Sequence, residues 1–216
     1  MLRELAQSPT GWLITFEGGD AAGKSTQLTL AAEWLQQRGF PVLTTREPGG
    51  TPFGQSIRSL ALNPDTTCCT LAELFLMLAD RAQHVADVIQ PALSDGFVVL
   101  CDRFNDSTVA YQGAAGGLDI HAVRECCSLA TSGVQPHLTI LLDITPEQAL
   151  RRISHVRDRM ERRPLAFHHT VRQAFLDLAA QEPNRFRVTD AASPEWIVAE
   201  HVQRSIGALL GLTGAA

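Results

Sequence analysis

Apolar residues are concentrated in short runs that alternate with longer segments of helical pattern. Runs of β-branched, aliphatic and aromatic residues occupy positions 12–17, 42–45, 97–101 and 137–143, and a weaker run occupies 186–189. Short, continuous apolar runs are typical of strands that are buried on both faces of a sheet. The pattern therefore predicts five strands.

The segments between these runs carry apolar residues at helical spacing. Helices are predicted over 24–38, 53–62, 71–93, 105–112, 119–132, 166–180 and 195–210, and another begins at Pro146 behind the N-cap Thr145. Strands that alternate with helices imply an α/β fold, a parallel sheet with helices on both faces. The chain shows no internal repeat or linker, so we expect a single domain over 1–216 with a loose N-terminal extension, 1–10.

A glycine-rich loop separates the first predicted strand from the first predicted helix. Residues 18–25 follow the pattern Gly-x4-Gly-Lys-Ser of a phosphate-binding loop, in the strand–loop–helix context that the motif requires. Among the 18 Lys and Arg residues, Lys24 is the only lysine, and a compact ammonium suits a position between two phosphates. Backbone N–H groups and the helix N-terminus would complete a nucleoside-triphosphate site, with the Ser25 hydroxyl as a ligand of Mg²⁺.

Composition and charge narrow the possible partners. The net charge of the 216-residue chain is −5, which argues against a nucleic-acid-binding face, and no apolar run is long enough to span a bilayer. The five cysteines are odd in number and lack C-x-x-C spacing, so we expect reduced thiols in a cytoplasmic protein. Six arginines lie between 151 and 163, a concentration that suits a small phosphorylated ligand.

Acidic residues end two of the predicted strands, at the edge where a parallel sheet binds ligands. Asp102 and Asp143 end the third and the fourth strand, and either carboxylate could hold the Mg²⁺. Arg103, which follows directly, favours Asp102, because the pair would place a metal-binding carboxylate beside a phosphate-binding guanidinium. A purely structural ion pair at the strand end is the alternative.

Several arginines are further candidates for phosphate binding. Arg46 directly follows the second strand, whereas Arg58 and Arg81 lie on the next two helices, where a solvated surface role stays open for each. The arginine-rich segment 151–164, called the lid below, loses its apolar periodicity after Ile153. A segment that closes over the triphosphate would bring guanidinium groups to the transferring phosphoryl group, and a solvated basic loop is the alternative.

Taken together, the motifs resemble those of the bacterial thymidylate kinases, a family of P-loop nucleoside-monophosphate kinases. The matching stretches occur in the order and at about the spacing of that family over nearly the whole chain. They are Phe-Glu-Gly-Gly-Asp-Ala-Ala-Gly-Lys-Ser-Thr at 16–26, Thr-Arg-Glu-Pro-Gly-Gly-Thr at 45–51, Ala-Asp-Arg-Ala-Gln-His at 79–84, Asp-Arg-Phe at 102–104, Ala-Tyr-Gln-Gly at 110–113, Leu-Leu-Asp at 141–143 and Asp-Arg-Met-Glu at 158–161.

The resemblance implies a P-loop NTPase fold with an arginine-rich lid, a cytoplasmic homodimer, and transfer of the γ-phosphoryl group of ATP to dTMP for dTTP synthesis, with Mg²⁺. ATP would be bound by the loop residues Gly18, Gly19, Asp20, Ala21, Ala22, Gly23, Lys24, Ser25 and Thr26. Carried over by position, dTMP would contact Asp20, Arg46, Arg58, Met77, Arg81, Arg103, Ser107, Thr108, Tyr111 and Gln112. Within this set Arg103 and Arg46 would hold the phosphate, and Arg81 and Gln112 would bind the thymine edge. Lys24, Arg103 and Asp20 are the implied catalytic residues outside the lid, with Ser25 and Asp102 at the metal.

One feature of the loop indicates a class within the family, and two features, the length of the lid and Met77, depart from the family pattern. Positions 21 and 22 are both Ala, so the loop lacks an arginine, and the resemblance then implies that the lid supplies the transition-state cation. Arg159 is the first candidate and Arg152 the second. The lid is about two residues shorter than in the family, which leaves open which of the two is catalytic. Met77 stands where the family usually has a Phe that stacks on thymine, which predicts weaker or looser base selection unless Phe75 or Phe104 compensates.

Two other functions remain possible at this level. One is a P-loop kinase of a different nucleotide or small metabolite. The other is an ATP-binding switch without an acceptor pocket, against which the set of Arg81, Tyr111 and Gln112 argues.

Overall fold

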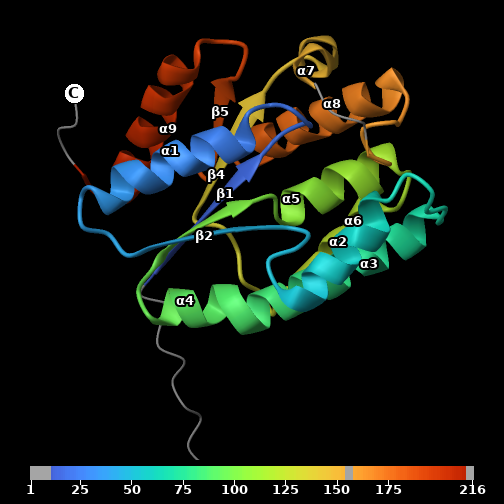
Figure 1. The fold of residues 1–216 in the computed structure, drawn as a ribbon, viewed down its shortest axis with the longest axis horizontal. Helices are drawn as coiled ribbons and strands as arrows, with labels where there is room; N and C mark the ends of the chain where they lie inside the picture. The colour runs from blue at the N-terminus through green and yellow to red at the C-terminus, as the bar shows by residue number, and fades with distance from the viewer. Residues whose placement is uncertain (1–10, 154–157, 213–216) are drawn as a thin grey trace, which may run out of the picture.

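The five predicted strands form one parallel sheet in the computed structural model, which describes residues 11–153 and 158–212. The strands are β1 (Trp12–Glu17), β2 (Val42–Arg46), β3 (Val98–Asp102), β4 (Leu138–Asp143) and β5 (Phe186–Asp190). Their order is β2-β3-β1-β4-β5, so that the strand before the glycine loop is central (Figure 1). The expectations for 1–10 and for 154–157 of the lid lie outside the described residues.

The helices agree closely with the predicted ranges. They are α1 (Lys24–Gln36), α2 (Pro52–Leu62), α3 (Thr70–His84), α4 (Gln90–Ser94), α5 (Asn105–Thr108), α6 (Ile120–Ala130), α7 (Pro146–Arg152), α8 (Leu165–Gln181) and α9 (Glu195–Leu209). Two π-helical segments were not predicted: η1 (Val85–Ile89) joins α3 to α4, and η2 (Val109–Ala115) continues α5. Apolar periodicity does not distinguish a π-helical turn from an α-helical one, so the sequence predicted ordinary helix there.

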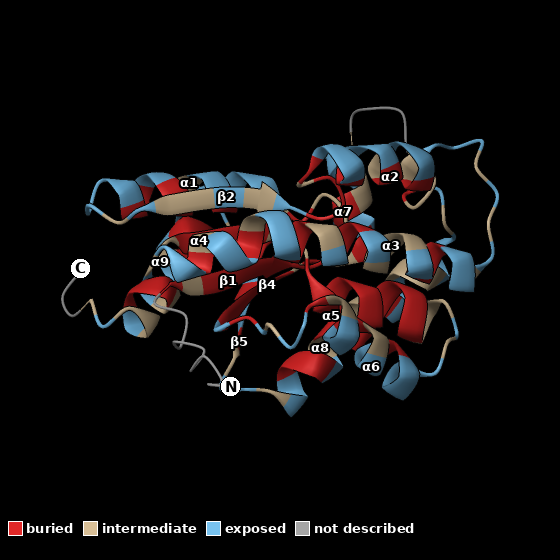
Figure 2. Cartoon of the chain, turned by 90° about the horizontal axis from the view of Figure 1, so that it is seen from below, coloured by how far each residue is buried: buried red, intermediate tan, exposed pale blue. Residues whose placement is uncertain are grey.

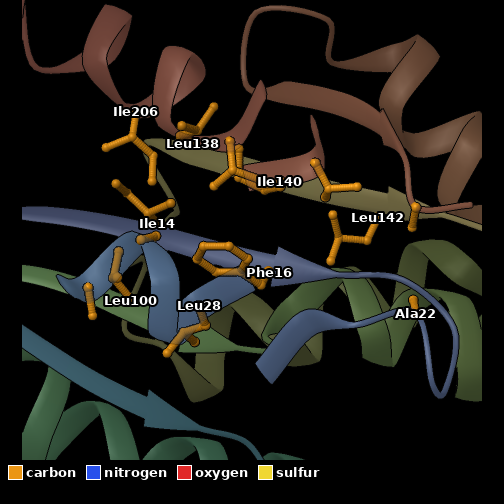
Figure 3. Packing of buried hydrophobic residues seen from close by; sticks show 14 of the residues in the cluster. Ile14, Phe16, Ala22, Leu28, Leu100, Leu138, Ile140, Leu142 and Ile206 are labelled. Carbon is orange, nitrogen blue, oxygen red and sulfur yellow. The ribbon is translucent and has the colours of Figure 1, made fainter. Parts of the chain in front are cut away.

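Helices cover both faces of the sheet, and the three central strands, β3, β1 and β4, are largely buried (Figure 2). On one face, Ile14, Phe16 and Leu100 pack with Leu28 of α1 and Ile206 of α9 (Figure 3). On the other face, Leu13, Val99 and Cys101 pack against η1 and α4, and Leu141 packs against α8. No helix within 11–153 and 158–212 is long and apolar enough to cross a membrane.

The strand register brings the predicted ligand-binding residues to one edge. Asp102 at the end of β3 pairs with Phe16 of β1 on one side and with Arg46 of β2 on the other. The loop after β1 therefore begins beside Asp102 and Arg46, as expected for the carboxyl edge of a parallel sheet.

Candidate active site

The glycine loop has the conformation of a phosphate cradle. Gly18 and Gly23 have φ values of 133° and 93°, which residues with a Cβ rarely adopt, and a Cβ at Gly18 would also collide with the carbonyl oxygen of Leu142. Lys24 Nζ donates hydrogen bonds to the carbonyl oxygens of Gly18 (3.2 Å) and Gly19 (2.7 Å). Burial and the nearby Arg103 lower the pKa of Lys24 to about 8.

The structure distinguishes the two carboxylates that were candidates for the metal. Ser25 Oγ donates a hydrogen bond of 2.8 Å to Asp102 Oδ2, so the hydroxyl and the carboxylate lie together at the start of α1. Asp143 is instead bound by Arg172, whose Nε and Nη2 donate to its two oxygens at 2.7 and 2.8 Å. Hydroxyl and carboxylate oxygens are suitable ligands for Mg²⁺, and Ser25 with Asp102 offers both.

Arg103 connects the glycine loop to the helix that follows β3. Its Nη1 donates to Gly18 O at 3.1 Å and to Ser107 Oγ at 3.0 Å, and its Nη2 lies 2.6 Å from Asp20 Oδ1. Burial by itself disfavours the charged forms of both Asp20 and Arg103. The charge of Arg103 nevertheless lowers the pKa of Asp20, and the neighbouring Tyr111 and Asp20 raise the pKa of Arg103.

A buried carboxyl group that the sequence analysis missed supports Arg103. Glu17 is 0% exposed and accepts hydrogen bonds from the backbone N–H of Phe104 (2.7 Å) and from Ser107 Oγ (2.6 Å). These bonds hold the chain around Arg103, which has a φ of 71°, a conformation that is uncommon outside glycine. Burial, with a smaller effect from Asp106, raises the pKa of Glu17 to about 8. A charged residue at the end of an otherwise apolar strand was the available signal.

Two adjoining cavities contain the predicted site residues. The first, called the acceptor cleft, is lined by Asp20, Arg58, Met77, Arg81, Arg103, Ser107, Thr108, Tyr111 and Gln112, together with Glu47, Glu73, Asp158 and Met160 among others. The second, called the phosphate cavity, is lined by Lys24, Ser25, Thr26, Arg46, Asp102 and Arg152 among others. Asp20, Glu47, Arg58, Arg103 and Asp158 line both cavities. The two ligands of such a site would therefore meet beside these five residues.

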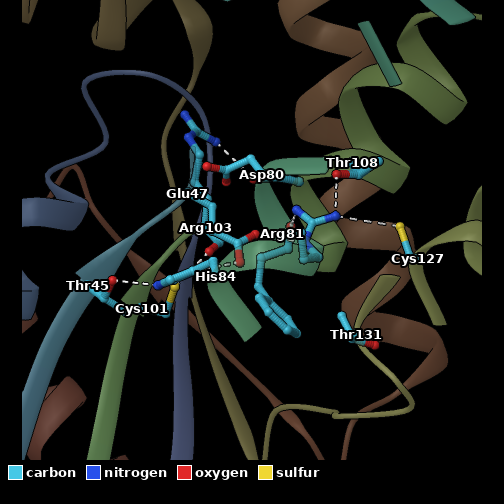
Figure 4. Close-up of polar contacts among 12 residues, drawn as sticks. Thr45, Glu47, Asp80, Arg81, His84, Cys101, Arg103, Thr108, Cys127 and Thr131 are labelled. Atoms are coloured by element: carbon cyan, nitrogen blue, oxygen red, sulfur yellow. Dashed lines mark hydrogen bonds and ion pairs between the residues drawn. The ribbon is translucent and has the colours of Figure 1, made fainter. Parts of the chain in front are cut away.

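A network of buried polar groups fixes Arg81 at the wall of the acceptor cleft (Figure 4). Its Nε lies 2.7 Å from Glu47 Oε2, the other oxygen of Glu47 lies 2.9 Å from His84 Nδ1, and His84 Nε2 shares a hydrogen bond of 2.7 Å with Thr45 Oγ1. Glu47, His84 and Cys101 bring ligand-type atoms within 4.8 Å of one another. The carboxylate of Glu47 is already engaged by Arg81 and His84, so this cluster serves to orient Arg81.

The two lid arginines occupy different places. Arg152, at the end of α7, lines the phosphate cavity, and its Nη2 donates to the carbonyl oxygen of Ala191 at 2.8 Å. Arg159 lies beside the acceptor cleft, where its Nη1 is 2.7 Å from Glu73 Oε2 and its Nε donates to Ala61 O at 2.7 Å. Of these two candidates, Arg152, the second from the sequence, is the one that borders the phosphate cavity.

The acceptor cleft contains no phenylalanine that would replace the missing stacking partner. Met77 lines the cleft as expected. Phe75 is 57% exposed, and Phe104 is fully buried beneath the Arg81 guanidinium, 5.4 Å from its ring centroid. Neither borders the cleft, so neither residue places an aromatic ring beside the thioether of Met77.

The fold and the joined cavities define the general class, a P-loop α/β protein that brings a triphosphate together with a second phosphorylated ligand. The family model described as thymidylate kinase matches residues 16–202. The chain belongs to the thymidylate kinase family.

Individual relatives agree with this assignment. The chain is 51% identical over 187 residues to a thymidylate kinase of Synechococcus sp. (strain JA-2-3B'a(2-13)), an alignment that covers 86% of this chain and 90% of that one. It is 46% identical over 210 residues to a thymidylate kinase of Clavibacter sepedonicus, covering 96% and 100% of the two chains. The crystal structure of thymidylate kinase from Ehrlichia chaffeensis superposes with a TM-score of 0.74 at 34% identity, over 91% of this chain and 98% of that one.

Proposed function

We propose that this protein transfers the γ-phosphoryl group of ATP to dTMP, giving dTDP and ADP. The observation that carries the proposal is the junction of the acceptor cleft with the phosphate cavity at Asp20, Arg58 and Arg103. An oxygen of the dTMP phosphate forms the new bond to the γ-phosphorus while the bond from that phosphorus to ADP breaks. Such a reaction requires alignment and charge neutralisation more than covalent help from the protein.

Each end of dTMP has a matching group. Arg103 and Arg46, with Arg58 close by, hold the acceptor phosphate, because guanidinium groups bind phosphate through paired hydrogen bonds. Arg81 and Gln112 bind the edge of the base. The residues Ser107, Thr108 and Tyr111 line the space for the base and sugar, and Asp20 faces the acceptor phosphate, the metal or the sugar hydroxyl.

The proposed metal is Mg²⁺, held by the Ser25 hydroxyl and by the Asp102 carboxylate. The hydrogen bond of 2.8 Å between them supports a shared site. Bound with ATP, the metal would neutralise charge on the phosphates. Lys24 adds a cation at the same phosphates.

For the transition-state cation we propose Arg152 ahead of Arg159. Arg152 borders the phosphate cavity, whereas Arg159 is engaged by Glu73. A guanidinium group that approaches the transferring phosphoryl group stabilises the negative charge on its oxygens.

The proposal extends to one domain over 1–216 and to a cytoplasmic homodimer. The five cysteines are free, which supports a reducing compartment. Large apolar side chains are exposed on the adjacent helices α2 (Phe53 and Leu60) and α3 (Leu71 and Phe75). Exposed apolar side chains on neighbouring helices support the proposed interface.

A coupled assay of ADP release, run with and without dTMP, tests the proposed function. A thymidylate kinase releases ADP only slowly until dTMP is added. A kinase of another small acceptor is stimulated by that acceptor and not by dTMP, and an ATP-dependent switch is stimulated by neither. Failure of dTMP to stimulate ADP release contradicts the proposal.

A further inference from the structure

A buried carboxylate on α3 lies behind the base-binding part of the acceptor cleft. Glu73 is 1% exposed, and its Oε1 accepts a hydrogen bond of 2.6 Å from Gln112 Nε2. Its Oε2 lies 2.7 Å from Nη1 of Arg159 and 4.0 Å from Nη2 of Arg163. The same carboxylate therefore contacts the side chain proposed to bind the base and two arginines of the lid.

The contact between Glu73 and Gln112 determines which way the amide group points. An ionised carboxylate can only accept hydrogen bonds, whereas a carboxamide has a donor end and an acceptor end. Gln112 must therefore turn its NH₂ group towards Glu73. The amide oxygen of Gln112 has no hydrogen-bond partner among the described residues, and the side chain lines the acceptor cleft.

We propose that Glu73 is a positioning residue for base selection, because it holds Gln112 with its acceptor oxygen available to the base. This inference rests on the proposed function. A thymine or uracil ring carries an N–H donor at position 3, which the oxygen of Gln112 accepts. A cytosine ring carries an unprotonated nitrogen there, and two acceptors facing each other in a buried site leave both without a partner.

Arg159 also contributes to the arrangement, because it compensates the charge of Glu73. A carboxylate that is almost fully buried requires a compensating charge, and the guanidinium group at 2.7 Å supplies it. Arg159 Nε also donates to Ala61 O, and its backbone N–H donates to Leu62 O at 3.2 Å. These bonds join the lid to the end of α2 and hold the guanidinium in place against Glu73.

The fixed guanidinium makes the effect of Glu73→Gln predictable. Arg159 has donors and no acceptor, so it attracts the oxygen of the new amide and leaves the new NH₂ group facing Gln112. Gln112 must then turn its own oxygen inward and present its NH₂ group to the base. The reversed amide suits the nitrogen acceptor of cytosine and opposes the N–H of uracil.

The test compares dUMP with dCMP as phosphoryl acceptors, because the two bases differ only at the edge in question, and includes dTMP as reference. In Glu73→Gln, the ratio of kcat/KM for dUMP to that for dCMP falls about 10- to 100-fold, the range expected for a mispaired buried polar group. The change appears in KM for the monophosphate, and KM for ATP stays the same. Glu125→Gln, the same chemical change at an exposed position of α6, is the matched control and leaves the ratio unaltered.

A second variant separates positioning from a merely structural role. In Glu73→Gln/Gln112→Glu the two side chains are exchanged, so the new carboxylate at 112 accepts from the amide at 73 and also presents an acceptor to the base. The preference for dUMP over dCMP returns, although the ion pair with Arg159 is lost. A double variant that discriminates no better than Glu73→Gln overturns the inference, and so does an unaltered ratio in the single variant. Wild-type protein that is not stimulated by dTMP contradicts the proposed function instead.

Discussion

At the phosphate end of the site, Arg46, Arg58 and Arg152 form no ion pair with any carboxylate in the described residues, whereas near the base Arg81 and Arg159 each contact a buried glutamate. Within residues 11–153 and 158–212, Arg58 and Arg152 donate only to the backbone carbonyl oxygens of Pro48 and Ala191, respectively. Arg81 and Arg159 lie 2.7 Å from Glu47 and Glu73, respectively. Arg103, where the two cavities meet, is the exception, because it pairs with Asp20 at 2.6 Å. The other arginines at the two ends differ in whether a protein carboxylate neutralises them.

The difference matches what each end has to bind. Cations without a protein counterion attract phosphates and gain their partner only when the ligand arrives. A neutral base offers no such charge, so guanidinium groups beside it are neutralised by the protein and held at fixed positions by hydrogen bonds. The phosphate end contributes attraction and stabilisation of charge, and the base end contributes geometry.

Removing one arginine from each end tests this difference between the two ends most directly. In Arg152→Ala the phosphoryl-transfer rate falls about 100- to 1000-fold, the loss typical when a group that stabilises transition-state charge is removed. In Arg159→Ala the rate falls much less, and the main effects are a higher KM for dTMP and weaker discrimination between bases. Single-turnover measurement of both variants reports the chemical step directly.

Arg204→Ala is the control for this pair, because Arg204 is exposed on α9 and pairs only with Glu200. Its rate matches that of the wild type. A larger rate loss in Arg159→Ala than in Arg152→Ala would reverse the assignment of the two ends.

A second prediction concerns the pH dependence of ATP binding at the phosphate end. The pKa of Lys24 is lowered to about 8 by burial and by Arg103. Without ATP, the Lys24 side chain therefore loses its positive charge as the pH rises above that value. The phosphates favour the charged form, and binding must then take up a proton. The affinity for ATP is therefore constant below about pH 7 and falls above pH 8, by up to about tenfold per pH unit.

Calorimetric titration of ATP between pH 6.5 and 9.5 measures this dependence. Lys24→Met binds ATP more weakly at every pH and lacks the loss of affinity above pH 8. If the loss persists in Lys24→Met, another group is responsible for it.

The phosphate end could be predicted from the sequence because its parts follow from local rules. Gly18, Lys24 and Ser25 belong to one continuous motif, and Arg46 and Asp102 directly follow apolar strands. In a parallel sheet the ends of adjacent strands lie side by side, so their proximity followed once the strands had been located. Arg103 already favoured Asp102 over Asp143 in the sequence, and the structure adds that Arg172 is bound to Asp143.

The base end depends on contacts between distant helices, which no local pattern reports. Glu73 lies in the first turn of α3, where an acidic residue is also typical of an exposed helix start. Its burial follows from the approach of Gln112, 39 residues further on, and of Arg159 from the lid. In the same way Glu47 was visible only as part of a motif, and its contacts with Arg81 and His84 appear only in the folded chain.

The smallest expected effect concerns Met77, the apolar residue at the base end. Phe75 and Phe104 do not border the acceptor cleft, so Met77→Phe adds a ring that neither of them supplies. Aromatic stacking contributes about 0.5–1.5 kcal/mol beyond the buried area, which raises the affinity for dTMP by a factor of about 2 to 10. Equilibrium binding of dTMP and dUMP measures the change. Stacking on the ring raises both affinities, whereas contact with the 5-methyl group raises only that for dTMP.

Leu129→Phe, at an exposed position of α6, is the control for adding a ring elsewhere and changes neither affinity. Unaltered binding of dTMP to Met77→Phe would show that the thioether already packs on the base as well as a ring does, and that geometry at this end does not depend on aromatic contact.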